Sequence, residues 1–165
     1  MRWISDHFII QSPRKPSMDE ILRLSTICVS RHGTSCIVID PFTNVRSTDT
    51  RKSRLDFIGD SLTDINRFKQ DYGTSMGILV HPTKPDAKRL NNIEAIGPYD
   101  LSGGAYWFDM SDEVVMVHRT DRSNSLAPVS IRIWKMRSRY HGKLGETQVQ
   151  FDIETGRYKD LGPPF

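Results

Sequence analysis

Two stretches of the chain share one form, an apolar run that ends in a polar side chain followed by proline. Residues 36–41 (CIVIDP) place Asp40 at this position, and residues 77–82 (GILVHP) place His81 there. Short, nearly continuous apolar runs are typical of strands in a parallel sheet that is covered on both faces. Open α/β sheets bind ligands beside the carboxyl ends of such strands. The two runs therefore predict an α/β fold with a site that contains Asp40 and His81.

An amphipathic helix is expected before each of these strands. Ser17 and Glu20 form a capping box, and apolar side chains then recur at helical spacing until Gly33 ends the pattern. Residues 55–72 place one apolar stripe on a second helix, which Gly73 ends. A helix, a turn and a strand thus follow one another twice, which predicts a doubly wound, mostly parallel sheet.

Shorter elements complete the expected fold. Residues 7–11 (HFIIQ) are predicted to form a short strand, and residues 83–99 a mobile polar loop. The later strands are expected to lie antiparallel at one edge of the sheet. The elements predicted there are a helix through Trp107, strands over residues 114–118 and 129–135, and a hairpin ending near Asp152 and Tyr158. The whole chain, residues 1–165, is predicted to be one domain with a frayed tail at residues 162–165.

Size and charge limit the classes of function. A chain of 165 residues with 37% hydrophobic residues can bury a core of its own. No apolar stretch approaches the roughly 18 residues of a membrane span, and the first residues lack a signal-peptide pattern. No membrane partner is therefore expected, and the expected location is the cytoplasm or the nucleoid. Positive charge gathers at residues 51–54, 84–89 and 132–143, which suits polyanions or simply forms a solvated surface.

Two patterns that often mark other chemistries do not apply. Cys28 and Cys36 have no partner at metal-ligand spacing, so two buried free thiols are expected. Residues 73–77 (GTSMG) match the GxSxG motif of serine hydrolases. In that motif the serine follows a strand and opens a helix, whereas Ser75 is expected to follow a helix and open a strand. A serine hydrolase is therefore excluded.

Asp40 and His81 each have two interpretations. An acid that closes an apolar strand is the Walker B pattern, in which the carboxylate holds Mg²⁺ beside nucleotide phosphates, often through water. An Asp at a strand end also commonly caps the following turn. A histidine at a strand end can simply bond to a backbone carbonyl. The expected position of both side chains at neighbouring strand ends favours the functional interpretation.

Two further stretches could bind phosphate groups. Lys135 and Arg137 close a strand whose apolar side chains, from Val129 onward, are expected to face inward. Because side chains alternate along a strand, both cations would project on that side, about 6.6 Å apart, where they could hold one phosphate. The alternative is a solvated strand end. The turn at residues 100–104 (DLSGG) could bind phosphodiester oxygens through its backbone amides, or could simply begin a helix.

Nearly the whole chain resembles the carboxyl-terminal part of the RecA-type ATPase core of hexameric replicative DNA helicases. This family includes Twinkle, the phage primase-helicases and, more distantly, the DnaB helicases. The matching stretches are VIDPF, LVHPTKP, YDLSGGAYWFDMSDEVVMVHR, and RIWKMRSRYHGKLG followed by FDIETGRY. The resemblance implies a RecA-like fold, ATP-dependent unwinding of DNA from 5′ to 3′, assembly as a hexameric ring, and single-stranded DNA as the partner.

The resemblance also implies roles for single residues. Asp40 would bind the Mg²⁺ of ATP or another nucleotide shared between subunits, and His81 would sense the γ-phosphate. Lys135 and Arg137 would be the piston lysine and the arginine finger that reach the ATP of a neighbouring subunit. Arg139 is a rival for the finger because the chain looks longer here than the phage enzymes. The acid, the imidazole and the paired cations are expected along a single rim of one twisted sheet.

Further implied roles concern the nucleotide base and the DNA. The base would lie between Arg119 and Phe151. The residues that would face the central channel and hold single-stranded DNA are Lys84, Lys88, Arg89, Ser102, Gly103 and Gly104. The resemblance adds the cytoplasm of a phage host and the mitochondrial matrix as expected locations.

The chain departs from the family because it contains no P-loop. The motif GxxxxGK[ST] does not occur, and the only Gly-Lys pair, at residues 142–143, precedes Leu144 in an expected hairpin. The family's catalytic glutamate also has no counterpart, so the P-loop unit is expected to be missing from the amino-terminal side. Weak or absent nucleotide binding and no useful ATP hydrolysis are expected of the chain alone. An apolar sheet surface is expected to be exposed, which calls for a partner polypeptide.

Three functions therefore stay open from the sequence. The first is the carboxyl-terminal portion of an ATP-dependent replicative helicase. The second is a non-enzymatic, split or degenerate helicase piece that binds single-stranded DNA or assembles with a P-loop-bearing subunit. The third is a RecA-like regulatory ATPase unrelated to replication, for which no salt-sensitive binding to single strands is expected.

Overall fold

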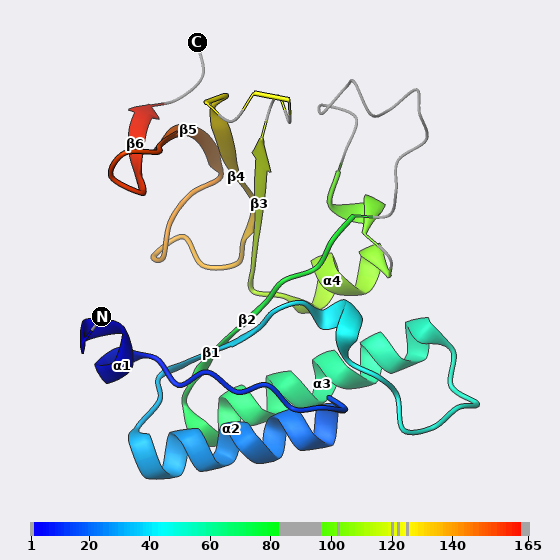
Figure 1. The fold of residues 1–165 in the computed structure, drawn as a ribbon. Coiled ribbons are helices and arrows are strands. Elements are labelled where there is room, and N and C mark those ends of the chain that lie inside the picture. The colour runs from blue at the N-terminus through cyan, green and yellow to red at the C-terminus, as the bar shows by residue number, and fades with distance from the viewer. Residues whose placement is uncertain are drawn as a thin grey trace. The chain divides into compact units, whose positions relative to one another are not determined.

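The computed structural model describes residues 2–82, 97–101, 103–119, 121, 123–124 and 126–162. The chain divides into two compact units, each with its own sheet (Figure 1). Unit 1 comprises Met1–Pro82 with Leu101–Tyr106, and unit 2 comprises Thr83–Asp100 with Trp107–Phe165. The α/β class predicted from the sequence is confirmed, while the single domain stays a prediction.

Helix α2 of unit 1 begins and ends where the sequence predicts. It spans Met18–His32, and the Ser17 hydroxyl accepts a hydrogen bond from the Glu20 amide at 3.3 Å. Gly33 ends the helix with a φ of 64°, a left-handed conformation that glycine adopts without a steric penalty. Cys28, on this helix, is half-buried.

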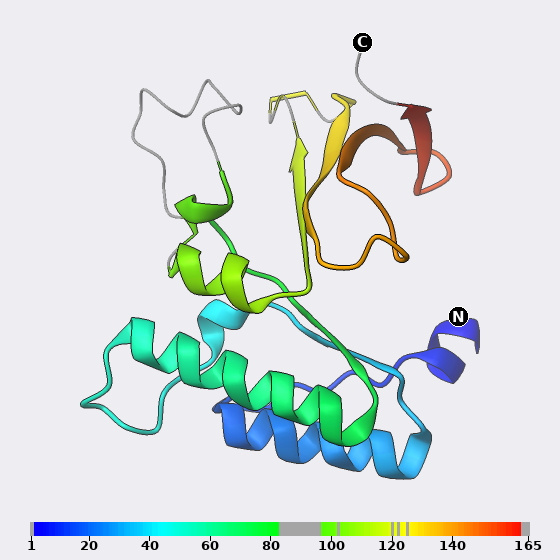
Figure 2. The same cartoon turned by 180° about the vertical axis from the view of Figure 1, so that it is seen from behind.

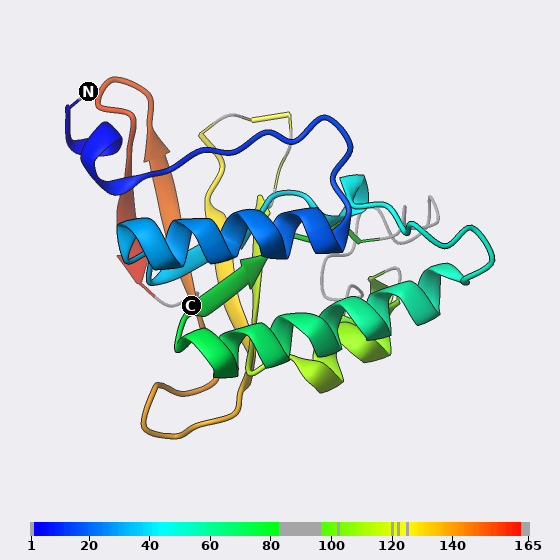
Figure 3. The same ribbon diagram turned by 90° about the horizontal axis from the view of Figure 1, so that it is seen from below.

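Helix α3 lies beside α2 and carries the apolar stripe expected from the sequence (Figure 2, Figure 3). It spans Arg54–Tyr72, begins at the Ser53 cap, and ends at Gly73, whose φ is 59°. The stripe, together with two residues of the preceding loop, forms the core of unit 1. The core side chains are Phe42, Val45, Phe57, Ile58, Leu62, Ile65 and Phe68, each no more than 7% exposed.

The strand predicted over residues 7–11 is wrong. Helix α1 occupies Arg2–His7, and no described residue pairs with the segment that follows it as a strand. The Trp3 and His7 rings stack with centroids 4.6 Å apart, and Nδ1 of His7 lies 2.8 Å from the Trp3 carbonyl oxygen. These local contacts stabilise a helical turn, whereas a strand gains its hydrogen bonds only from a neighbouring strand.

The two apolar runs form the parallel sheet that the sequence predicts. Strand β1 (Cys36–Ile39) pairs in register with strand β2 (Ser75–Ile78). Ser75 opens β2 directly after α3, as expected when the GxSxG motif was rejected. The sheet is not covered on both faces, however, because Val38 is 59% and Leu79 43% exposed. Cys36 is exposed as well, so the expectation of two buried thiols was wrong.

Unit 2 contains a four-stranded antiparallel sheet in the order β3-β4-β5-β6. Helix α4 precedes it at Gly104–Met110 and crosses the boundary between the units. The strands are β3 (Glu113–Arg119), β4 (Val129–Met136), β5 (Gly145–Asp152) and β6 (Arg157–Gly162). The late strands are thus confirmed, but they form a sheet of their own rather than an edge of the parallel one. Consecutive strands with short connections pair antiparallel, which accounts for the separate sheet.

The predicted bounds of the carboxyl-terminal tail and of one loop differ slightly from those in the structure. Gly162, where the tail was expected to begin, is the last residue of β6, and residues 163–165 lie outside the described residues. The predicted loop at residues 83–99 falls outside them up to residue 96, and a short 3-10 turn follows at Pro98–Asp100. None of the helices that the structure describes is long and apolar enough to cross a membrane.

Candidate functional site

Asp40 and His81 lie at the same end of the β1–β2 sheet. The two chains stay bonded beyond the strand ends, because the Leu79 amide donates to the Ile39 carbonyl at 2.9 Å and the Phe42 amide donates to the Leu79 carbonyl at 3.0 Å. Asp40 lies between these two hydrogen bonds, opposite Leu79 of the neighbouring chain segment. His81 comes two residues after Leu79. Both side chains are exposed. The structure thus brings together the acid and the imidazole that the sequence singled out.

The segment after Asp40 is fixed to the first turn of α3 by Arg54. Its guanidinium donates to the Val45 carbonyl at 2.9 Å and to the Phe42 carbonyl at 3.4 Å. The same group lies 5.3 Å from the Phe42 ring centroid and 5.2 Å from that of Phe57. Burial lowers the pKa of Arg54, but a guanidinium stays charged at neutral pH. Arg54 therefore positions the loop that leaves the end of β1.

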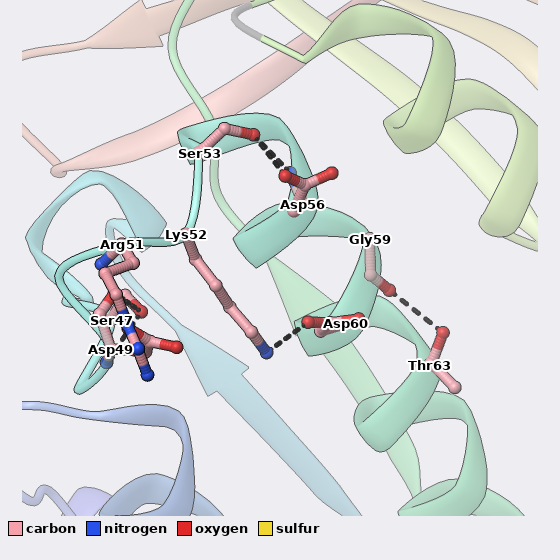
Figure 4. A network of polar contacts seen from close by, with 9 residues as sticks. All are labelled: Ser47, Asp49, Arg51, Lys52, Ser53, Asp56, Gly59, Asp60 and Thr63. Carbon is pink, nitrogen blue, oxygen red and sulfur yellow. Dashed lines mark hydrogen bonds and ion pairs between the residues drawn. The ribbon is translucent and has the colours of Figure 1, made fainter.

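Sequence reasoning missed the role of Arg54 because it belongs to the basic run at residues 51–54. The other cations of this run are also used locally (Figure 4): Arg51 pairs with Asp49, and Lys52 with Asp60. The available signal was the position of Arg54 at the start of a helix, directly after an N-cap serine. A basic residue there is not favoured by the helix dipole, which points to another reason for it.

The glycine-rich turn before α4 lies next to the segment that carries His81. Pro82 forms an isolated antiparallel bridge with Leu101. Gly103 has a φ of 85°, and its carbonyl accepts the Tyr106 amide at 3.0 Å. Of the residues predicted to contact DNA, Gly103 and Gly104 are thus close in the fold to the end of β2. The other four, Lys84, Lys88, Arg89 and Ser102, lie outside the described residues.

Gly59 on α3 makes room for this turn. A Cβ atom built on Gly59 would lie 3.2 Å from Cε1 of Tyr106. That separation is short for two carbon atoms, which attract best at about 3.5–4.0 Å. The absence of a side chain at Gly59 therefore lets the first turn of α4 approach α3 closely.

Lys135 and Arg137 do not continue a regular strand, which corrects the alternation argument made from the sequence. Lys135 pairs with Val114, but Ile133 pairs with Val115, so β4 carries an extra residue, Trp134, between them. A bulge of this kind interrupts the alternation of side chains. Arg137 lies just beyond the last residue of β4. The expected continuation of the inward face from Val129 to the two cations is therefore interrupted before Lys135, whereas pairing continues beyond it, where the Arg137 amide donates to the Asp112 carbonyl at 2.9 Å.

Each of these two cations has a partner within unit 2. The Lys135 ammonium donates to the Phe108 carbonyl and, at 3.1 Å, to the Asp109 carbonyl, and it lies 5.1 Å from the Phe108 ring centroid. It thus binds the last turn of α4, where free carbonyls attract cations. Arg137 pairs with Asp112 at 2.7 Å, with side chains 60% and 45% exposed.

Arg119 and Phe151 lie on one face of the unit 2 sheet and near one end. Arg119 pairs with Val129 of β4, and Val129 pairs with Val149 of β5. Residues directly opposite each other project on the same face, and so does Phe151, two positions after Val149. Lys135, six positions after Val129 on β4, is about 20 Å from that end at the usual rise of a strand.

The acid and the imidazole belong to one sheet and the two cations to another. The expected rim on a single sheet is therefore not found. Asp40 and His81 lie at the end of β1 and β2, and Lys135 and Arg137 lie at the end of β4.

The donor set at Asp40 suits Mg²⁺ only in combination with another ligand. Within the described ranges, no group of three or more His, Cys, Asp or Glu side chains could hold a metal ion. Mg²⁺ commonly binds one or two carboxylates and completes its shell with water and substrate phosphates. An exposed carboxylate beside an open strand end fits that kind of site, so Asp40 could hold the metal of a bound nucleotide.

Comparisons with known proteins agree with the fold. No family model matches the chain. Over 96% of its length it is 29% identical to the Twinkle homolog protein, chloroplastic/mitochondrial, of Arabidopsis thaliana, of which it spans 23%. A DnaB-like replicative helicase superposes with a TM-score of 0.73 at 16% identity, covering 90% of this chain and 36% of that one. A second solved structure, an ATPase domain, superposes with a TM-score of 0.71 at 18% identity, covering 88% and 52%.

The predicted RecA-like architecture is thereby confirmed. The solved structures show the fold, and the curated relative, of which the chain spans about a quarter, shows sequence kinship along almost the whole chain. The chain therefore has the RecA-like fold of the ATPase domain and of the DnaB-like helicase, and its sequence is similar to that of a Twinkle homolog.

Proposed function

We propose that the chain supplies part of the nucleotide- and DNA-coupling machinery of an ATP-dependent 5′ to 3′ replicative DNA helicase. The observation that carries the proposal is the position of Asp40 and His81 at the same end of two paired parallel strands. Kinship with a Twinkle homolog along 96% of the chain supports it. The chain would work within a ring of helicase subunits, or beside a subunit that carries a P-loop.

Asp40 would hold the Mg²⁺ of a nucleotide, and this metal would neutralise charge on the β- and γ-phosphate oxygens. His81 would donate a hydrogen bond to the γ-phosphate. Pro82, the next residue, is bridged to Leu101, two residues before Gly103. A shift of the imidazole on loss of the γ-phosphate would therefore be passed along the backbone to the turn at residues 101–104. That coupling would link hydrolysis to the proposed DNA-binding loops.

Arg137 would act in the ATP site of a neighbouring subunit by exchanging Asp112 for a phosphate. An exposed ion pair is worth only about 0.2–1 kcal/mol, so this exchange costs little. Lys135 would have to leave two carbonyls and the Phe108 face, which is the larger change. Arg139 is the alternative finger, since it is exposed and lies two residues after Arg137.

Arg119 and Phe151 would hold the nucleotide base. Their side chains share one face of the sheet, and the Phe151 ring is supported by Tyr158 at a centroid distance of 5.1 Å. Stacking of a base against an aromatic ring and a guanidinium is favourable whatever the base. Little discrimination between nucleotides is therefore proposed.

Complementation in trans tests the proposal. The chain is mixed with a P-loop-bearing subunit of a related helicase whose own arginine finger is replaced by alanine. Recovery of ATPase activity that falls by about 10³–10⁵ with Arg137→Ala supports the finger role. Arg157→Ala, an exposed arginine on β6, is the control and leaves the recovered rate unchanged. If only Arg139→Ala abolishes recovery, the role belongs to Arg139, and no recovery with the unaltered chain contradicts action in trans.

A non-enzymatic role is the second candidate. In this case the chain binds single-stranded DNA or joins a P-loop-bearing subunit without hydrolysis of its own. Binding should weaken with salt, and removing one phosphate contact lowers the log–log slope by about 0.7. Alanine at Lys84, Lys88 and Arg89 should therefore flatten the slope, and an unchanged slope excludes these residues. Absence of any salt-sensitive binding favours the regulatory ATPase.

A further inference from the structure

A small pocket in unit 1 has no part in the proposed helicase site. It has a volume of about 150 Å³ and lies between the first turn of α2, the loop at residues 46–52 and one face of α3. Neither Asp40 nor His81 lines it. Pockets that hold drug-sized ligands usually measure about 300–1,000 Å³, so this one suits a single functional group rather than a nucleotide.

The lining of the pocket is acidic. Asp19, Asp49, Asp60 and Asp64 line it together with only two cations, one of which is Lys52. Lys52 donates to Asp60 at 2.5 Å, as Figure 4 shows, and Asp49 accepts the Arg51 amide at 2.9 Å. Two ion pairs in this part of the structure join Lys52 to Asp60 and Arg51 to Asp49, and neither pair uses Asp19 or Asp64. Two carboxylates of the lining thus remain available to a cation.

A buried hydroxyl in the same pocket also has no partner. Ser61 is 1% exposed, and its Oγ makes no hydrogen bond with another described residue. A serine or threonine in a helix usually bonds to the carbonyl four residues earlier. Thr63 does so with Gly59 at 2.9 Å (Figure 4), but Ser61 does not. A buried polar atom without a partner is uncommon and costs free energy, so its position in a pocket points to a ligand.

The residues that face the pocket from α3 follow from helical spacing. Phe57, Asp60, Ser61 and Asp64 follow the pattern i, i+3, i+4, i+7 and therefore share one face of the helix. The first supplies an apolar wall, and the others supply two carboxylates and the hydroxyl. An apolar wall beside carboxylates suits a cation at the end of an alkyl chain.

The pKa of Lys52 shows that the electrostatic potential in the pocket is negative. The hydrogen bond and charge of Asp60 raise the pKa of Lys52 above its usual value, and the charges of Asp49 and Asp64 add to the rise. A bare metal ion is a poor alternative, since no metal-binding group of three ligating side chains occurs in the described part of the chain.

We propose that this pocket binds a basic side chain, an alkylguanidinium or alkylammonium group, presented by a partner protein. Asp64 and Asp19 would carry the compensating charge, and Ser61 Oγ would accept a hydrogen bond from the cation. Charge complementarity selects the occupant, and the small volume admits one side chain. The proposal does not depend on the helicase function, because it uses none of the residues assigned to nucleotide or DNA.

The test is a titration of the ¹⁵N-labelled chain with the peptide acetyl-Gly-Arg-Gly-amide, followed by NMR. The amide signals of residues 57–64 should shift, whereas the same peptide with neutral citrulline should leave them unchanged. Asp64→Asn should weaken binding about two- to fivefold, the range of a partly exposed ion pair. Ser61→Ala, which removes only one oxygen, should weaken it as well. Asp71→Asn, the same change on the same helix outside the pocket, should have no effect.

Three results would overturn the proposal. The first is equal binding of the citrulline peptide, and the second is a shift map that lies away from residues 57–64. The third is spermidine binding in this pocket without binding of the arginine peptide, which would assign the site to a free polyamine instead of a protein side chain.

Discussion

The two units of the chain are built by different means. Unit 1 packs two capped helices beside a two-stranded parallel sheet, and most of the buried apolar side chains of the described residues belong to it. Unit 2 is an antiparallel sheet with few fully buried side chains, among them Trp107 and Val129. Its strands are joined instead by cross-strand hydrogen bonds and ion pairs, such as Arg132 with Glu146 at 2.6 Å.

This difference separates two kinds of candidate site residue. Asp40 and His81 extend from a unit with a well-packed core, which fixes their backbone. Lys135 and Arg137 belong to a unit held largely by polar contacts, and their own partners are carbonyl oxygens and a carboxylate. Polar contacts at a surface exchange at low cost. The acid and the imidazole are thus suited to a fixed position, and the two cations to a change of partner.

The largest effect on stability is expected from Phe42→Ala. Phe42 is 1% exposed and packs against Phe57 at a ring-centroid distance of 5.8 Å, so its removal leaves a cavity in the core of unit 1. The free energy of unfolding should fall by about 3–5 kcal/mol, measured by urea denaturation. Val117→Ala in unit 2 is the control, because Val117 is 68% exposed and should change stability by less than about 0.5 kcal/mol. Similar losses for both variants would remove the contrast between the units.

A smaller effect is expected from Arg54→Lys. Lysine keeps the charge but cannot donate to the Val45 and Phe42 carbonyls in the same fork-like geometry. The loss of hydrogen bonds from a charged group should lower the free energy of unfolding by about 1–2 kcal/mol. Arg51→Lys, at a side chain 91% exposed, is the matched control and should be neutral. If both changes are neutral, Arg54 does not hold the segment after Asp40.

Local sequence patterns predicted the elements of unit 1 well. The Ser17 capping box, the αL glycines Gly33 and Gly73 and the 3.6-residue apolar period act within a few residues, so the sequence displays them directly. The equivalent ends of β1 and β2 also followed from the sequence, because each strand is preceded by a helix that returns the chain to the same side. The position of Asp40 and His81 at one end of a parallel sheet therefore followed from the sequence.

Features that depend on distant partners were not predictable. Whether residues 7–11 form a strand depends on a neighbouring strand, and the sequence of residues 7–11 does not show whether such a neighbour is present. The extra residue at Trp134 arises from the pairing of β4 with β3. Asp112 as the partner of Arg137, and Arg54 as a link to two carbonyls, are contacts between elements as well. The composition of the chain and the spacing of its residues do not determine any of these contacts between elements.

The charge network of unit 2 should give a pH-dependent effect of intermediate size. Glu146 accepts a hydrogen bond from Ser130 and bonds to Arg132 at 2.7 Å. The Ser130 hydrogen bond, followed by that of Arg132, lowers the pKa of Glu146 below its usual value of 4.5. A lowered pKa in the folded state stabilises the fold above the unfolded value, and this stabilisation is lost as the pH falls through the folded one.

Glu146→Gln should therefore cost about 1 kcal/mol at pH 7 and less below pH 4.5, as followed by urea denaturation at several pH values. Glu154→Gln, on the exposed β5–β6 turn, is the matched control and should show no such dependence. A cost for Glu146→Gln that is the same at pH 3 and pH 7 would mean that the network does not act through the ionised carboxylate.

The smallest effect on stability is expected from Arg137→Ala, although its effect on function should be large. The Arg137–Asp112 pair is mostly exposed, and such pairs contribute about 0.2–1 kcal/mol, so urea denaturation should show a loss of less than about 1 kcal/mol. Lys135→Ala should cost more, because Lys135 binds the last carbonyls of α4 and the Phe108 ring. A small loss of stability with a large loss of complementing ATPase activity would mark Arg137 as a residue kept for a partner's nucleotide. A large loss of stability would instead make it a structural residue of unit 2, and the contrast between a fixed acid and an exchangeable cation would not hold.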